Sequence, residues 1–209
     1  MKSFKLYMEQ QNAFTVGLFP GAFKPPHKGH FETAKRMCDE NRIAVVLVSS
    51  ETRENITAEQ SLKIWEIYKK YLPKNLHVFQ SSGSPITAIY QIVNILNNGK
   101  YVPTSEKSLA PLPDALSIAE QLKTNNGPYK IDLYASKEDQ KRYAAFFDPK
   151  KSELYKTKQV TGIDAKDVSR LASATKAREA LKNHDTEEFT SFLPPISDED
   201  KSRIVKLLS

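Results

Sequence analysis

Gly17-Leu-Phe-Pro-Gly-Ala-Phe-Lys-Pro-Pro-His-Lys-Gly-His30 is the stretch that decides the fold. The apolar run at 14–19 predicts a buried strand, and residues 31–38 predict a helix. The prolines and glycines between them predict a sharp, stiff turn. The first backbone N–H groups of a helix lack partners within it, and the helix dipole is positive there. A strand, a tight loop and a helix start therefore predict a phosphate site.

His27 and His30 are the chemical groups of this turn. Their spacing puts both imidazoles over the first turn of a helix that begins near His27. Gly29 leaves room for a nucleotide to lie against the backbone. Imidazoles can donate hydrogen bonds to phosphate oxygens. A solvated helix start or half of a metal site would also give such a pair. The metal site is disfavoured because no Cys, His or carboxylate cluster nearby completes a ligand set.

The order of strand, Gly/Pro loop and His27-Lys-Gly-His30 resembles the HxGH signature of the nucleotidylyltransferase superfamily. That superfamily includes pantetheine-phosphate and nicotinamide-mononucleotide adenylyltransferases and small cytidylyltransferases, and the Gly-Ala-Phe-Lys-Pro-Pro-His form looks closest to divergent, virus-type members. The resemblance implies an α/β fold: a Rossmann-like, doubly wound parallel sheet of about five strands with helices on both faces and a C-terminal helical tail.

A second motif, Ser173-Ala-Thr-Lys-Ala-Arg178, strengthens this resemblance. Ser173 or Thr175 can cap a helix that begins there. Lys176 and Arg178 then lie in the first turn, where positive charge is unfavourable because of the helix dipole. A bound anion at this helix start would offset that cost. The stretch resembles the ISSTKVR or ISGTxIR motif that grips the triphosphate, but Ala174 stands in place of a serine.

The chain between the two motifs reads as alternating strands and helices. The β-branched run 42–48 predicts a strand covered on both faces, with the polar loop 49–55 at the edge where ligands bind. Thr57 and Gln60 predict a capping box, and Gly99 predicts a left-handed helix end. Further strands are predicted at 76–79, 130–135 and 159–163, and further helices at 86–96, 115–123, 186–193 and 198–208.

Length and composition favour one domain. The 209 residues are 39% hydrophobic and carry a formal charge of +6 spread along the chain. This balance suits anionic small molecules and makes nucleic acid an unlikely partner, because no dense basic stripe occurs. Residues 1–12 are expected to be a leader, 13–170 the α/β core with an extended connection at 100–128, and 171–209 the C-terminal helices.

The single cysteine excludes an intramolecular disulfide, and the chain shows neither a signal-peptide core nor an apolar run of the ~20 residues that span a bilayer. The expected location is therefore the cytoplasm, with no membrane partner; a homo-oligomer is compatible with the sequence. The absence of GxGxxG and GxxxxGK[ST] loops argues against a dinucleotide-binding dehydrogenase and a P-loop enzyme.

The resemblance implies an enzyme that moves a nucleoside monophosphate, AMP before CMP, from a nucleoside triphosphate to the phosphate of a small molecule. Mg²⁺ would be held by the substrate, with no metal ligand from the protein. One alternative is a non-catalytic nucleotide-binding or structural protein that retains the fold. Another, weaker one is a fragment of a class I aminoacyl-tRNA synthetase, whose HIGH motif is related.

The expected catalytic residues are His27, His30, Lys176 and Arg178. Residues 130–142 resemble the superfamily's strand-then-GSDxxxxR region, which lies beside the nucleotide. This resemblance adds Asp139 and Arg142 to the expected site. The expected nucleotide-binding residues are Phe19, Pro20, Gly21, Ala22, Phe23, Gly29, Asp139, Arg142, Ser173 and Thr175. The expected acceptor-binding residues are Lys24, Ser49 and Arg53.

Overall fold

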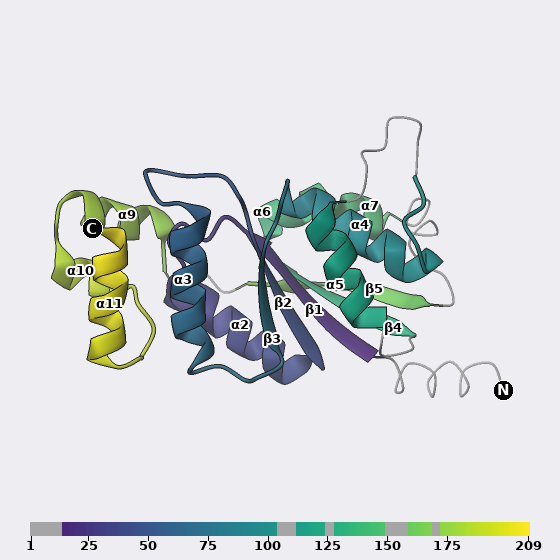
Figure 1. Ribbon diagram of the computed structural model, residues 1–209, viewed down its shortest axis with the longest axis horizontal. Helices are drawn as coiled ribbons and strands as arrows, with labels where there is room; N and C mark the ends of the chain where they lie inside the picture. The colour runs from purple at the N-terminus through teal and green to yellow at the C-terminus, as the bar shows by residue number, and fades with distance from the viewer. Residues whose placement is uncertain (1–13, 104–111, 124–127, 149–158, 169–171) are drawn as a thin grey trace.

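The computed structural model describes residues 14–103, 112–123, 128–148, 159–168 and 172–209. Its sheet is parallel throughout and has the order β3-β2-β1-β4-β5 (Figure 1). The strands are β1 Phe14–Gly21, β2 Ile43–Val48, β3 Leu76–Gln80, β4 Tyr129–Ala135 and β5 Val160–Asp167. The expected Rossmann-like sheet is therefore confirmed. Because the chain runs outward from β1 on one side and then returns to its other side, the strand order reverses between β1 and β4.

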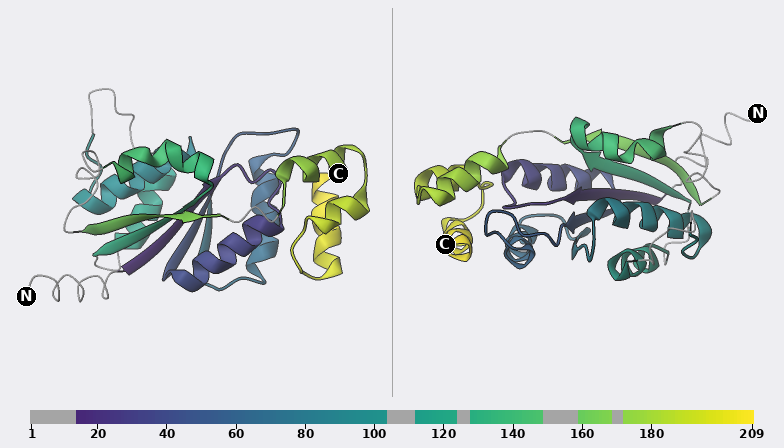
Figure 2. Two further views of the ribbon diagram at one scale, coloured as in Figure 1. Left: turned by 180° about the vertical axis from the view of Figure 1, so that it is seen from behind. Right: turned by 90° about the horizontal axis from the view of Figure 1, so that it is seen from above.

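Helices cover both faces of the sheet (Figure 2). One face carries α2 Lys28–Glu40 and α3 Ala58–Lys69. The other carries α4 Pro85–Asn98, α5 Pro113–Lys123, and α7 Ala144–Phe147. Two short turns, α6 Lys137–Gln140 and the 3₁₀ helix η1 Lys141–Tyr143, follow β4. The C-terminal helices are α9 Ala174–Lys182, α10 Thr186–Ser191 and α11 Asp198–Leu208.

The strand β2 shows why the sheet is buried on both faces. Ala44, Val46 and Val48 belong to the core under α2 and α3, while Val45 and Leu47 belong to the core under α4 and α5. Successive side chains of a strand point to opposite faces, so a continuous apolar run fits only a strand that is covered twice. The prediction made from the β-branched run is confirmed.

Local signals fixed several helix ends as expected. The hydroxyl of Thr57 accepts from the Gln60 N–H at 3.2 Å, and Gln60 Oε1 accepts from the Thr57 N–H at 2.9 Å. Gly99 ends α4 with φ 71°. Two strands run further than expected, to Gly21 for β1 and to Asp167 for β5. The expected leader at 1–12 lies outside the described residues, as does much of the connection at 100–128, within which α5 is confirmed.

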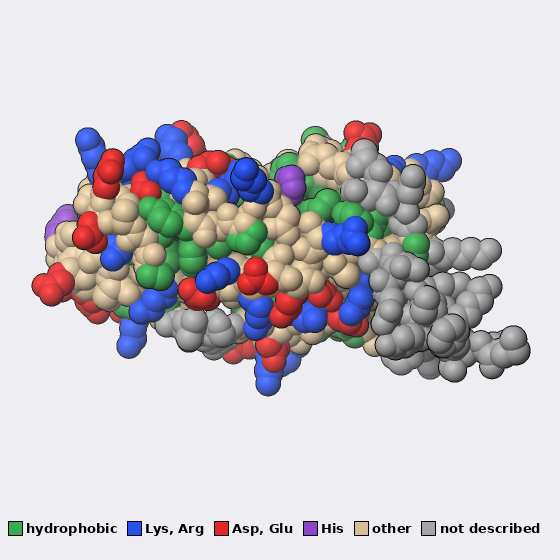
Figure 3. All heavy atoms as spheres, turned by 90° about the horizontal axis from the view of Figure 1, so that it is seen from below, with side chains coloured by type: hydrophobic (Ala, Val, Ile, Leu, Met, Phe, Trp, Pro, Cys, Tyr) green, Lys and Arg blue, Asp and Glu red, His purple; other side chains and the backbone are tan. Residues whose placement is uncertain are grey.

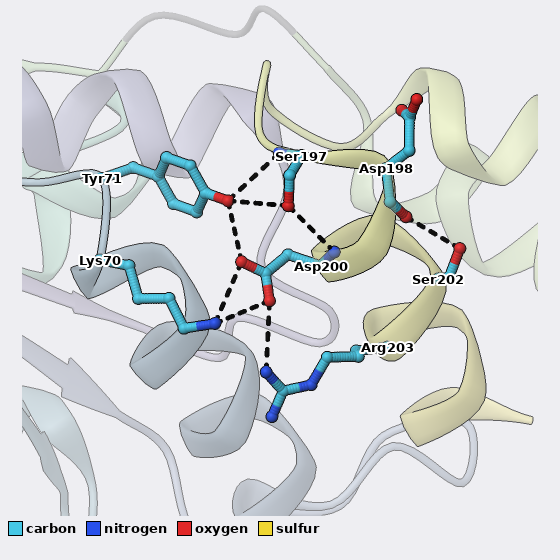
Figure 4. A network of polar contacts seen from close by, with 7 residues as sticks. All are labelled: Lys70, Tyr71, Ser197, Asp198, Asp200, Ser202 and Arg203. Atoms are coloured by element: carbon cyan, nitrogen blue, oxygen red, sulfur yellow. Dashed lines mark hydrogen bonds and ion pairs between the residues drawn. The ribbon is translucent and has the colours of Figure 1, made fainter.

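A polar network pins α11 to the end of α3 (Figure 4). Asp200 accepts from Lys70 Nζ at 2.8 Å and from the Tyr71 hydroxyl at 2.8 Å, and Arg203 lies 3.4 Å from it. The hydrogen bonds from Lys70 and Tyr71 lower the pKa of Asp200. Beside this network, the Lys28 N–H donates to the Phe192 carbonyl at 2.8 Å. The C-terminal helices are thus held against the N-terminus of α2.

The described surface mixes charges of both signs. The face in Figure 3 carries Lys and Arg side chains interspersed with Asp and Glu, around an apolar band. On this face the formal excess of positive charge is thus not gathered into one basic surface. No helix among the described ranges combines the length and apolarity needed to cross a bilayer.

Candidate functional site

The two histidines of the first motif cap α2 reciprocally. His27 is the N-cap residue, and its Nδ1 accepts from the Gly29 N–H at 3.1 Å. The Nδ1 of His30 accepts from the His27 N–H at 3.3 Å. The rings stack, with centroids 3.7 Å apart and planes 20° from parallel. Because each Nδ1 accepts a hydrogen bond, each neutral ring carries its proton on Nε2.

Burial keeps this pair neutral at physiological pH. Desolvation lowers the pKa of His27 to about 4, against the raising effect of its backbone hydrogen bond and with a small lowering effect of Lys28. Desolvation also lowers the pKa of His30 well below its ordinary value, with a further contribution from His27. The site thus presents two neutral Nε2–H donors beside a helix N-terminus, and the first turn of α2 holds no acidic residue.

Gly29 lies close against the capping imidazole. A Cβ at this position would lie 3.2 Å from Cε1 and 3.3 Å from Nδ1 of His27. Such contacts are tighter than those of nearly all real Cβ atoms. The glycine therefore lets the capping imidazole fold back over the helix start, in addition to leaving space for a ligand.

The loop 22–26 is held by side chains from other elements. Its carbonyl oxygens accept from Ser61 at 2.7 Å, from Tyr68 at 3.1 Å and from Arg178 at 2.9 Å. A loop rich in proline has few backbone donors, so its shape depends on such outside donors for its carbonyls. The three partners come from α3 and α9, which ties the shape of this loop to the docking of the C-terminal helices.

Lys24 is buried, with only 2% of its surface exposed. Its Nζ donates to the carbonyl oxygens of Ala22 and Ser49, both at 3.1 Å. These two carbonyls lie at the ends of β1 and β2. Desolvation lowers the pKa of Lys24 to about 8. An ammonium has three donors, so this arrangement leaves one N–H for a ligand.

Two adjoining cavities open at the carboxyl ends of β1 and β4. The first has a volume of about 390 Å³ and the second about 440 Å³. The first cavity is lined by residues from six parts of the fold (β1, the loop after it, α2, β4, α6 and α9) and by Arg53, Ser136 and Val168. These residues are Phe19, Pro20, Gly21, Ala22, Phe23, Lys24, His30, Arg53, Ala135, Ser136, Glu138, Asp139, Val168, Ala174 and Arg178. The second is lined by Pro20, Gly21, Ala22, Ser49, Glu51, Arg53, Ser84, Pro85, Ile86, Ala135, Asp139, Arg142 and Tyr143. Their position is the point of strand-order reversal, where open α/β sheets bind ligands.

The second motif contributes Arg178 to the first cavity. Ser173 caps α9 and accepts from the Lys176 N–H at 3.4 Å. Arg178 is only 6% exposed, and its Nη2 lies 3.4 Å from the Thr175 hydroxyl. Lys176 is exposed and lines neither cavity. Residues two apart on a helix face different directions, so the two cations of this motif separate.

The structure thus brings together most of the expected site. Ten expected residues line the first cavity, namely Phe19, Pro20, Gly21, Ala22, Phe23, Lys24, His30, Arg53, Asp139 and Arg178. Ser49 and Arg142 line the second. The remaining expected residues, His27, Gly29, Ser173, Thr175 and Lys176, line neither cavity. Of these, His27 stacks on His30 and Thr175 contacts Arg178, so both lie next to residues of the cavity wall.

Comparisons with known proteins find relatives by structure only. No protein family's sequence profile matches the chain, and no curated protein matches it. A Vibrio parahaemolyticus protein assigned as a nicotinate-nucleotide adenylyltransferase superposes with a TM-score of 0.51 at 13% identity, over 93% of this chain and 97% of that one. The bifunctional NMN adenylyltransferase/ADP ribose pyrophosphatase of Francisella tularensis gives 0.51 at 14% identity, over 82% of this chain and 43% of that one.

A third solved structure agrees with these two. The nicotinic acid mononucleotide adenylyltransferase of Plasmodium falciparum, complexed with NaAD, gives a TM-score of 0.50 at 12% identity, over 92% of this chain and 95% of that one. The fold is that of the nucleotide adenylyltransferases. This confirms, at the level of fold, the resemblance drawn from the HxGH motif; the likeness to virus-type members stays a prediction.

Several residues of this nucleotidylyltransferase fold escaped sequence reasoning. Ser61 and Tyr68, which hold the loop 22–26, looked like ordinary positions of an amphipathic helix. Glu54, which pairs with Arg178 Nε at 2.8 Å, looked like part of a polar loop. Nothing local marks these residues, because their roles arise from contacts with elements far away in the sequence. The separation of Lys176 from Arg178, in contrast, follows from helical spacing alone.

Proposed function

We propose that the chain is a nucleotidylyltransferase, which transfers a nucleoside monophosphate from a nucleoside triphosphate to the phosphate of a small molecule and releases pyrophosphate. AMP is the favoured group and CMP the next. One observation carries this proposal: His30 and Arg178, from opposite ends of the chain, line one cavity at the reversal point of the sheet. Two sets of phosphate-binding groups that were predicted separately thereby face a shared space.

The chemistry needs no protein nucleophile. An oxygen of the acceptor phosphate attacks the α-phosphorus, a new P–O bond forms, and the bond between the α-phosphorus and the bridging oxygen breaks as pyrophosphate leaves. Catalysis then consists of holding both anions in line and stabilising charge on the phosphoryl oxygens. The donors for this task are the Nε2–H groups of His27 and His30, and the guanidinium of Arg178.

The triphosphate lies, in this proposal, between the start of α2 and the start of α9. The imidazoles of His27 and His30 hold its α- and β-phosphates, with His30 closer to the reacting centre. Arg178 and the backbone N–H groups near Thr175 hold the β- and γ-phosphates, and the exposed Lys176 approaches the γ end from outside.

Magnesium fits this site as an ion held by the substrate. The carboxylates that line the first cavity are Glu138 and Asp139, and one oxygen of Asp139 accepts from the Ser136 hydroxyl at 2.8 Å. Within the described residues no three His, Cys, Asp or Glu side chains gather into a metal cluster. In this proposal Mg²⁺ would be held mostly by phosphate oxygens and water, and would supply positive charge to the phosphates.

The second cavity is the proposed acceptor site. Its charged side chains are the cations Arg53 and Arg142 and the acids Glu51 and Asp139, and the Ser49 hydroxyl adds a small polar group. Arg142 Nη1 lies 3.7 Å from Asp139 Oδ1. Lys24 stands at the wall of the neighbouring cavity with one donor left for a phosphate. This arrangement supports a small acceptor that bears a phosphate.

Turnover of α-³²P-labelled ATP and CTP, with magnesium and a panel of phosphate-bearing acceptors, tests the proposal. We expect labelled product and stoichiometric pyrophosphate with at least one pair. A thermal-shift screen of the four nucleoside triphosphates identifies the base beforehand. Binding of a triphosphate without pyrophosphate release from any acceptor would instead favour a non-catalytic nucleotide-binding protein.

A further inference from the structure

The turn at residues 53–56 has an unusual backbone for its sequence. Arg53 and Ile56 exchange two backbone hydrogen bonds, of 3.1 and 3.0 Å. The central residues Glu54 and Asn55 have φ values of 49° and 66°. Two consecutive positive φ angles occur in type I′ turns, which favour Gly, Asn and Asp. Glutamate is unfavourable at the first of these positions, so the backbone conformation alone does not account for Glu54, and the contacts of its side chain become informative.

The side chain of Glu54 reaches the arginine of the second motif. Its Oε1 lies 2.8 Å from Nε of Arg178. The other nitrogens of the same guanidinium are also engaged: Nη1 donates to the Lys24 carbonyl at 2.9 Å, and Nη2 lies 3.4 Å from the Thr175 hydroxyl. The ion pair and these two hydrogen bonds hold the guanidinium, although the Nε–H itself has no hydrogen-bond partner among the described residues. One N–H on each of Nη1 and Nη2 is left for a ligand.

The carboxylate holds the guanidinium from the side away from the nucleotide. Arg178 lines the first cavity and also an outer cavity of about 510 Å³, which lies between the turn, α9 and the end of α11. Glu54 lines the outer cavity and not the first. It therefore does not occupy the space proposed for the triphosphate. Among the described residues it is the carboxylate that pairs with this buried cation.

We propose that Glu54 is a positioning residue that orients Arg178 toward the triphosphate. This role rests on the proposed function, because it concerns how that site binds its nucleotide. The strained turn holds the carboxylate, the carboxylate holds the guanidinium as an ion pair at Nε, and Arg178 lines the first cavity. Loss of the carboxylate should weaken triphosphate binding more than it slows the chemical step.

Kinetics of Glu54→Gln and Glu54→Gly test this role, with Glu59→Gln as the matched control. Glu59 is an exposed acid of α3 that pairs with Lys63 only on the helix surface. We expect both Glu54 variants to raise KM for the triphosphate about tenfold, with kcat changed less than about threefold, since one close ion pair to a buried guanidinium orients the arginine. Glu54→Gly also removes the backbone strain, so a residue that served only the turn would tolerate it fully. Glu59→Gln should leave both constants unchanged.

A double-mutant cycle and one spectroscopic measurement complete the test. In an Arg178→Lys background, Glu54→Gln should change KM no further, because its effect passes through the guanidinium. The Arg178 Nε–H signal in ¹⁵N NMR, assigned by its loss in Arg178→Lys, should change its chemical shift in Glu54→Gln and keep it in Glu59→Gln, because the carboxylate 2.8 Å from Nε is then neutralised. This readout requires no nucleotide.

Two results overturn the role of Glu54: an unchanged KM in both Glu54 variants, or a full effect of Glu54→Gln in the Arg178→Lys background. If the wild type binds neither nucleoside triphosphates nor inorganic triphosphate, the proposed function fails and the role fails with it. A wild type that binds while the Glu54 variants match it defeats only the role.

Discussion

The reciprocal cap at the start of α2 means that the two histidines serve stability and chemistry at once. Replacing His27 with alanine removes the N-cap side chain, which is the acceptor for the buried Gly29 N–H. Loss of an N-cap costs about 1 kcal/mol, within a range of about 0.5–2 kcal/mol. For a chain of this size, about 1–2 kcal/mol corresponds to a fall in Tm of about 2–8 °C. An alanine variant therefore confuses a folding effect with a catalytic one.

Two substitutions separate these effects. Asparagine is among the best N-cap residues, and glutamine is a usual partner at the third helical position of a capping box. His27→Asn and His30→Gln should therefore keep both caps while removing both imidazole donors. We expect the free energy of unfolding of each variant to stay within about 0.5 kcal/mol of wild type. Turnover should fall by about 10²–10³, the usual loss when one preorganised donor to a developing oxyanion is removed.

Urea unfolding and pyrophosphate release, measured on the same preparations of the four proteins, test this reasoning. The comparison needs wild type, His27→Ala, His27→Asn and His30→Gln. If His27→Asn and His30→Gln both turn over within about tenfold of wild type, the imidazoles are not the phosphate donors. If His27→Ala unfolds at the same urea concentration as wild type, the capping argument is wrong, whatever the kinetics show.

Four further outcomes follow from burial and packing. Unfolded His27 takes up its proton near pH 6.5, and folded His27 only near pH 4. The free energy of unfolding should therefore fall by up to about 3 kcal/mol as the pH drops from 6.5 to 4, and the fall should be smaller in His27→Asn. Lys24 acts in the same direction at higher pH: its folded pKa of about 8 lies below 10.5, so stability should rise between pH 8 and 10.5 in wild type, and this rise should be absent in Lys24→Met. A Cβ at Gly17 would lie 2.4 Å from Cγ of buried Met37, so Gly17→Ala should cost about 1–3 kcal/mol in urea unfolding, and an unchanged midpoint would contradict this packing. Asp200→Asn should speed hydrogen exchange in α11 but not in α4, and uniform exchange would show that the network in Figure 4 does not hold α11.

Much of the fold was predictable because its signals are local. The apolar run of β2, the capping box of Thr57 and Gln60, and the left-handed end at Gly99 each depend on a few neighbouring residues. Strand ends were less predictable. β1 continues through Pro20 to Gly21 because its partner β2 continues beside it to Val48, and the sequence of β1 does not contain that information.

The candidate site divides in the same way. The sequence by itself determined a strand, a stiff loop and a helix whose start is built from two imidazoles, because turn chemistry and helix capping act within a few residues. Tertiary structure decided which cation meets that pair. In the folded chain α9 lies beside the loop after β1, so Arg178 is buried and donates to the Lys24 carbonyl while Lys176 faces solvent. It also decided that Lys24 is buried between the ends of two strands, because the pairing of β1 with β2 places the Ser49 carbonyl within its reach.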